Sequence, residues 1–156
     1  MQIIDYFSSA DKTQWLCEIK KSDWCAGQYL CELLQKGELK KLCGSGAKVL
    51  LLTQGDELVS FCTYAEQDEI AEPSLAPWIG FVYTFPAHRG KRLAGKLIER
   101  ACALAKDKGH EFIYVSTDAA GLYENYGFTF WKNMKNIRGE DCRVYRRNLA
   151  CSSEIK

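Results

Sequence analysis

Residues 81–97 read FVYTFPAHRGKRLAGKL, and this stretch decides the fold. Aromatic and β-branched residues up to Thr84 predict a strand, and from Leu93 onward apolar residues recur at helical spacing. A tight turn that contains Gly90 has to join the two elements. Because the first-turn amides of a helix lack intrahelical partners and carry the positive end of its dipole, this turn is predicted to bind an anion.

The side chains around the turn favour the same interpretation. The residues that would let an anion approach the backbone are Gly90, Ala94 and Gly95. The residues that add formal positive charge are Arg89, Lys91, Arg92 and Lys96. Such a combination at a helix N-terminus indicates a pyrophosphate site. The charge alone would also fit an ordinary solvated helix start with scattered basic residues.

The turn also resembles a known family signature. Its pattern Arg89-x-x-Arg92-x-Ala94 is similar to the coenzyme A loop of the GNAT N-acetyltransferase superfamily, Gln/Arg-x-x-Gly-x-Gly/Ala. Arg92 departs from this pattern, because glycine is usual there; its side chain could crowd the phosphate or give it a charge-assisted contact. Residues 121–128, GLYENYGF, resemble the family's second block, Leu-Tyr-Glu-Lys-x-Gly-Phe. The two blocks occur in the family's order within residues 77–128, about a third of the chain.

Strands and helices are predicted on both sides of this unit. Before it, the patterns favour strands over 2–7, 49–52, 58–64 and 78–84, and helices over 11–21, 22–37 and 39–42. Ser9 or Asp11 would cap the first helix, and Ser22–Asp23 the second. From the turn onward, the predicted elements are a helix over 92–108, a strand over 112–115, a short helix over 122–126, and strands over 128–134 and 142–147. The strand after the long helix implies a parallel crossover.

This element order and the resemblance together imply a mixed α/β (α+β) fold. The sheet is expected to be mostly antiparallel, with six to seven strands and helices on both faces, as in GNAT proteins. Residues 1–150 are expected to form a single domain, followed by a tail at 151–156.

Composition excludes several other classes of protein. Of the 156 residues, 47% are hydrophobic and the formal net charge is +1, so no overall field would recruit nucleic acid or an anionic membrane. The sequence predicts neither a membrane span nor a secretory signal, and we therefore expect a cytoplasmic protein. The eight cysteines form no CxxC pair and are predicted to be buried or incidental thiols, and no metal site is expected.

The resemblance implies how acetyl-CoA, the expected co-substrate, would be held. Backbone groups of Phe81, Val82 and Tyr83 would pair with the pantetheine arm in the opening between two splayed strands. The pyrophosphate would lie on the turn formed by Arg89, Gly90, Lys91, Arg92, Ala94 and Gly95. An amine then attacks the thioester directly, which leaves two proton transfers for the protein.

Tyr123 and Asp68 are the predicted catalytic residues. Tyr123 occupies the position of the family's tyrosine acid, and a phenol of pKa about 10 suits a thiolate leaving group; simple packing of the ring is the alternative. Some family members carry a glutamate in the central strand, but residues 78–84 contain no carboxylate. Asp68, in the loop that enters this strand, is therefore preferred as the base over Glu69 and Glu72. Solvated loop charge, His88 and a chain of water molecules remain alternatives for that role.

The predicted function is transfer of an acetyl group to an amine, from a small molecule or a protein. The alternative is a non-catalytic acyl-CoA-binding sensor or partner domain, which the missing strand carboxylate and Arg92 would suit. Trp15, Trp24 and Tyr29 belong to the helices that, by resemblance, form one wall of the acceptor site; simple packing against the sheet explains them equally well. The sequence predicts no nucleic-acid or membrane partner, and leaves open whether the chain forms a homodimer.

Overall fold

The computed structural model describes residues 1–118 and 121–150. The strands are β1 (Gln2–Asp5), β2 (Lys48–Gln54), β3 (Glu57–Ala65), β4 (Trp78–Thr84), β5 (Phe112–Thr117), β6 (Thr129–Lys135) and β7 (Asp141–Asn148). The α-helices are α1 (Lys12–Lys20), α2 (Cys25–Gln35), α3 (Leu39–Cys43) and α4 (Leu93–Asp107). Short 3₁₀ turns occupy Tyr6–Ser8, Pro86–His88 and Tyr123–Tyr126. The tail predicted at 151–156 lies outside the described residues.

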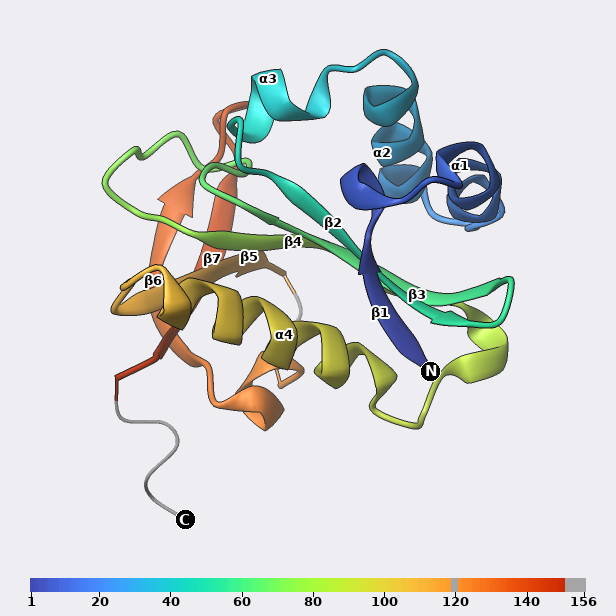
Figure 1. Ribbon diagram of the computed structural model, residues 1–156. Helices are drawn as coiled ribbons and strands as arrows, with labels where there is room; N and C mark the ends of the chain where they lie inside the picture. The colour runs from blue at the N-terminus through green and yellow to red at the C-terminus, as the bar shows by residue number, and fades with distance from the viewer. Residues whose placement is uncertain (119–120, 151–156) are drawn as a thin grey trace.

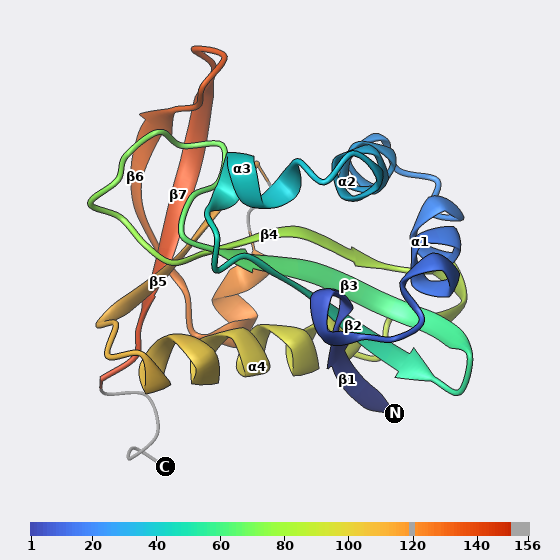
Figure 2. The ribbon, with the colours of Figure 1, turned by 45° about the horizontal axis from the view of Figure 1, so that its top comes forward.

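The strands form one mixed sheet in the order β1-β2-β3-β4-β5-β7-β6. Only β4 and β5 pair in parallel, through the crossover helix α4, and the other neighbouring strands are antiparallel. Helix α4 covers one face of the sheet, and α1, α2 and α3 lie on the other (Figures 1 and 2). The predicted fold class, with its parallel crossover, is therefore confirmed.

Each helical layer has its own apolar core. Side chains of β2, β3 and β4 that face α4 pack against its apolar stripe, which includes Leu97, Ile98 and Ala101. Alternate side chains of the same strands pack against α1 and α2 around Ile19 and Leu30. This division follows from the two-residue period of a strand, which points successive side chains to opposite faces. Among the described residues, no helix combines the length and apolar character needed to cross a bilayer.

Two local predictions were wrong at the N-terminal end. The first strand stops at Asp5 because its carboxylate accepts a hydrogen bond from the Phe7 amide and starts the 3₁₀ turn. Helix α2 begins after Trp24, with no side-chain cap from Ser22 or Asp23. The Asp23 carboxylate instead accepts a hydrogen bond from the Tyr83 hydroxyl at 2.6 Å. The Asp23 carboxylate, which the local pattern assigned to capping, is used in this tertiary contact instead.

The feature that positions the site is the separation of β4 from β5. The two strands pair only at Trp78 with Tyr114 and at Ile79 with Val115, and then part. At the same point the register of the pairing between β3 and β4 shifts, and Phe81 has a left-handed φ of 50°. A bulge of this kind bends a strand and increases its twist. Among the described strands, none pairs with the β5-facing edge of residues 80–84.

Candidate active site

The turn between β4 and α4 is anchored to the end of its own strand. Arg89 donates a hydrogen bond from Nε to the Thr84 carbonyl oxygen at 2.8 Å. Its guanidinium also lies 5.3 Å from the ring centroid of Tyr83, within range of a cation–π contact. The Arg89 side chain therefore fixes the turn, and backbone amides remain available to an anion.

Two residues of this turn have left-handed backbone conformations. Gly90 has a φ of 84°, and a Cβ built there would meet no atom within 4 Å. Arg92, at the N-cap position of α4, has a φ of 56° and a ψ of 32°. Such a conformation brings the Cβ of an L-residue too close to the backbone, whereas glycine adopts it freely. This geometry gives a physical reason why glycine is usual at position 92 in the family pattern.

The first turn of α4 offers a surface that fits an anionic group. Gly90, Lys91 and Arg92 are exposed, and Ala94 is half-buried. A shallow depression of about 660 Å³ follows the exposed side of the helix beside Arg92, Lys96 and Arg100. Backbone amides, the helix dipole and these three cations favour an anionic group, and Glu99, which also lines the depression, is paired with Arg147.

Gly95 has a packing role that the sequence did not suggest. It is buried, and a Cβ there would lie 2.6 Å from a ring carbon of Tyr126. Its missing side chain therefore makes room for the Tyr126 ring against α4. A direct contact of Gly95 with the coenzyme stays a prediction.

On the opposite face of the sheet lies a second cavity, of about 300 Å³. Its walls come from α2, α3, the loop between β3 and β4, the diverging strands β4 and β5, and the turn between β6 and β7. Phe81 lines it directly, whereas Val82 packs toward α4 and Tyr83 packs into the core on the α1–α2 face. The cavity therefore reaches the strand opening from the face opposite α4.

Asp68 lies in this cavity, against the backbone of β4. Its Oδ1 is 2.6 Å from the position that a Cβ on Gly80 would take, so any side chain there would require the carboxylate to shift. Burial raises the pKa of Asp68 from its ordinary 3.8 to about 7. A hydrogen bond from the Glu69 backbone lowers this pKa, and the negative charge of Glu69 raises it. A carboxylate with such a pKa can accept a proton near neutral pH.

Tyr123 lies on the other side of the sheet. It belongs to the core cluster facing α4, is 5% exposed, and packs edge-on against Phe128 at 5.8 Å. Burial raises its pKa above the ordinary value of 10.0, and the nearby Cys62 and Asp68 raise it further. The phenol is therefore held in its protonated form, which is the form that can donate a proton.

Aromatic side chains form one wall of the cavity. Phe81 packs against Trp24 and Tyr29, with ring centroids 6.5 and 6.3 Å apart. Trp24 also stacks on Tyr83 at 5.5 Å. Trp15 is 6% exposed and belongs to the core between α1 and the sheet, so it has a packing role.

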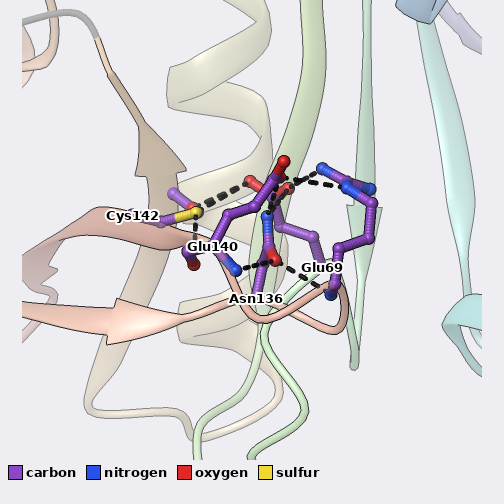
Figure 3. A network of polar contacts seen from close by, with 6 residues as sticks. Glu69, Asn136, Glu140 and Cys142 are labelled. Carbon is purple, nitrogen blue, oxygen red and sulfur yellow. Dashed lines mark hydrogen bonds and ion pairs between the residues drawn. The ribbon is translucent and has the colours of Figure 1, made fainter.

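Glu69 is the centre of a polar network that the sequence did not reveal (Figure 3). Its carboxylate accepts hydrogen bonds from Ser116 at 2.9 Å and from Asn136 at 3.5 Å, and pairs with Arg138 at 3.4 Å. The buried Asn136 also accepts hydrogen bonds from the backbone amides of Arg138 and Glu140. The turn between β6 and β7 is thereby fixed against the β3–β4 loop. Asn136-x-Arg138-Gly139 signals a turn, but no local signal points to a partner 67 residues away.

The remaining candidates for the base lie elsewhere. Glu72 accepts a hydrogen bond from Ser74 within its own loop. His88 contacts Glu57 through Nε2 at 3.1 Å. Within residues 1–118 and 121–150, no three His, Cys, Asp or Glu side chains gather as a metal site would require. The cysteines of this part of the chain are all free, and five of them are buried.

Comparison with known proteins places these features in a family. The family model for the acetyltransferase (GNAT) family matches residues 12–128. No curated protein matches the chain significantly in sequence.

Solved structures share the fold over nearly the whole chain. A GNAT-family protein from Desulfovibrio desulfuricans superposes with a TM-score of 0.71 at 14% identity, covering 96% of this chain and 99% of its own. An aminoglycoside 6'-acetyltransferase of type Ii gives 0.69 at 16% identity, with 96% and 97% covered. A Salmonella typhimurium protein solved with its cofactor acetyl-CoA gives 0.60 at 18% identity, with 96% and 94% covered. At these low identities the likeness indicates the shared fold alone.

Proposed function

Because the chain belongs to the acetyltransferase (GNAT) family, we propose that it transfers the acetyl group of acetyl-CoA directly to the amine of a small molecule. The observation that carries the proposal is the Asp68 carboxylate, which lies against Gly80 where β4 leaves β5. The similar aminoglycoside 6'-acetyltransferase is named for a small-molecule amine, which supports this acceptor class.

The coenzyme would be held by the backbone of this chain. The unpaired edge of β4, from Phe81 to Tyr83, offers amide and carbonyl groups to the pantetheine arm, as a neighbouring strand would. The turn offers the amides from Gly90 to Ala94 and positive charge to the pyrophosphate, whereas the Arg89 amide is bonded to the Pro86 carbonyl oxygen. When bound, acetyl-CoA supplies an electrophilic thioester carbonyl at the strand opening.

The acceptor would reach this opening through the cavity that contains Asp68. Aromatic rings of Trp24, Tyr29 and Phe81 attract a cationic ammonium group, which leads it toward the carboxylate. Asp68 then accepts a proton from the ammonium group, so that the amine nitrogen regains its lone pair. The nitrogen forms the new bond to the acetyl carbon as the carbon–sulfur bond breaks.

The proton needed by the departing sulfur would come from Tyr123. Its hydroxyl lies in the core on the α4 face, while Asp68 lies in the cavity on the other face. The two proton transfers therefore take place on opposite sides of the strand opening. Burial keeps Tyr123 protonated and gives Asp68 a pKa of about 7, so each residue is in the required state near neutral pH.

A thiol-release assay with acetyl-CoA and a panel of amines tests this function. The wild type should release thiol only when an acceptable amine is present, and Tyr123→Phe and Asp68→Asn should each lower kcat by roughly 10²-fold or more. Glu72→Gln, in the same loop as Asp68, is the matched control and should keep wild-type turnover. Coenzyme binding, followed by thermal shift, should be preserved in all four proteins.

Two results would contradict the proposal. Tight coenzyme binding without turnover on any amine would favour the sensor or partner domain instead. Wild-type turnover in both Tyr123→Phe and Asp68→Asn would remove these residues from the mechanism.

A further inference from the structure

The cavity that contains Asp68 has two chemically different ends. At the inner end, Asp68 lies against the β4 backbone, and Glu69 lies beside it in sequence and also lines the cavity. Only Arg138 brings a formal positive charge to the described lining, and its guanidinium is paired with both Glu69 and Glu140. The inner end is therefore suited to a cationic group.

The outer rim is apolar and exposed. Tyr29, Leu42 and Ile137 line the cavity, and their side chains are 48%, 41% and 59% exposed. They are half of the six large hydrophobic residues that are most exposed in the described part of the chain. Exposed apolar side chains that gather at one place usually mark a binding surface. The three come from α2, α3 and the β6–β7 turn, so the fold itself brings them together.

Ile137 is held at the rim by the network around Glu69. Its backbone amide donates a hydrogen bond to the Glu69 carbonyl oxygen at 2.8 Å, and its neighbours Asn136 and Arg138 bond to the Glu69 carboxylate. An isoleucine side chain with more than half of its surface in water contributes little to the stability of the fold, because it buries little apolar area. The fixed backbone nevertheless keeps this side chain over the cavity, where it can contact a ligand.

The size of the cavity limits the acceptor. At about 300 Å³ it lies at the lower end of the range for small-molecule sites. A compact amine fits this volume, whereas a polyhydroxylated molecule with several charged amines would place polar groups against the apolar rim and leave them without partners.

We propose that the acceptor is a small primary monoamine whose amino group is joined by a short linker to an apolar, preferably aromatic, body. The ammonium group points toward Asp68, and the apolar body lies between the aromatic wall and the rim formed by Tyr29, Leu42 and Ile137. This inference rests on the proposed function and adds the class of substrate to it.

Two amines that differ only at the far end of a two-carbon chain test the proposal. The wild type should acetylate 2-phenylethylamine with a kcat/KM at least about tenfold higher than ethanolamine, since a phenyl group gains the apolar contacts that a hydroxyl lacks. Kanamycin serves as the polycationic comparison and should be a poorer substrate than 2-phenylethylamine.

Rim variants test where the preference arises. Ile137→Ser and Leu42→Ser should each lower kcat/KM for 2-phenylethylamine by about three- to tenfold and lower that for ethanolamine by a smaller factor. Ile137→Ser keeps the backbone hydrogen bond to Glu69, so the turn should stay in place. Phe130→Ser removes another exposed apolar side chain, from β6 outside the cavity lining, and should change neither value.

The outcomes separate this inference from the function on which it rests. Equal or better turnover of ethanolamine or kanamycin would overturn the substrate class while acetyl transfer to amines stands. An unchanged preference in both rim variants would overturn the assignment of the rim. Coenzyme binding without turnover of any amine would overturn the proposed function itself.

Discussion

Replacing Arg92 with glycine should make the protein more stable, and the accompanying change in coenzyme affinity should identify the role of the Arg92 side chain. Arg92 is an exposed residue with a φ of 56° and a ψ of 32°, at the N-cap of α4. A left-handed conformation costs an ordinary residue roughly 1–2 kcal/mol. Glycine avoids this strain but loses about 0.5–1 kcal/mol through the greater freedom of the unfolded chain. Removing a cation from the positive end of the helix dipole stabilises the folded protein by about 0.3–1 kcal/mol. Together these contributions raise the free energy of unfolding of Arg92→Gly by about 1 kcal/mol relative to wild type.

Arg92→Ala separates the two contributions. Alanine also removes the cation but keeps a Cβ in the strained conformation, so it should be less stable than the glycine variant. For a domain of this size, 1 kcal/mol corresponds to a Tm shift of roughly 2–4 °C. Thermal unfolding without ligand, followed by circular dichroism, would measure the difference between the two variants.

Coenzyme binding decides between the two roles that the sequence leaves open for Arg92. If its guanidinium contacts phosphate, both variants should bind acetyl-CoA about tenfold more weakly, a loss of about 1.4 kcal/mol, and the loss should shrink at high salt. If the side chain crowds the phosphate, Arg92→Gly should bind more tightly than wild type. Equal Tm values for the glycine and alanine variants would refute the reasoning from backbone strain.

Two further predictions concern Asp68 and the strand behind it. Because the folded protein raises the pKa of Asp68 to about 7, kcat/KM should rise with pH to a plateau above pH 7, and Asp68→Asn should abolish this limb of the profile. The same shift should make the free energy of unfolding fall as pH rises from about 4 to 7, because the Asp68 carboxyl loses its proton at lower pH in the unfolded chain than in the folded protein. The same pH dependence of stability in wild type and Asp68→Asn would contradict the assignment. Gly80→Ala would place a Cβ 2.6 Å from the carboxylate oxygen, so kcat/KM should fall by roughly 10²-fold while Tm changes little, because the carboxylate end can move aside. Wild-type turnover by Gly80→Ala would show that the position of Asp68 does not matter.

The parts of the fold that follow from local patterns could be predicted from the sequence. Helix α4 was expected over 92–108 and is found at Leu93–Asp107, because its apolar residues recur at helical spacing and glycine ends it. The parallel partner of β4 follows from the length of that crossover. The left-handed residues Phe81 and Arg92 could not be predicted from propensity, since neither residue type favours that conformation.

The candidate site also combines parts that local sequence patterns predict with parts that they do not. The turn at residues 89–94 and Tyr123 could be proposed as site elements because each belongs to a continuous block of sequence. The cavity that contains Asp68 is built from segments far apart in the chain, so its lining could not be predicted, and neither could the network that joins Glu69 to Asn136. Choosing Asp68 from the loop before β4 was a hypothesis based on reach along the chain. The contact that now supports it, with Gly80, arises only when the loop folds back on its strand.

This contact also explains how a site can have a carboxylate without carrying one on its central strand. Strand β4 has glycine at position 80, and the Asp68 carboxylate fills the space at 2.6 Å from the absent Cβ. The loop residue therefore brings a carboxylate against the central strand, and a side chain at position 80 would require that carboxylate to shift. The missing strand carboxylate, which suited a non-catalytic domain at the level of sequence, therefore no longer argues against catalysis.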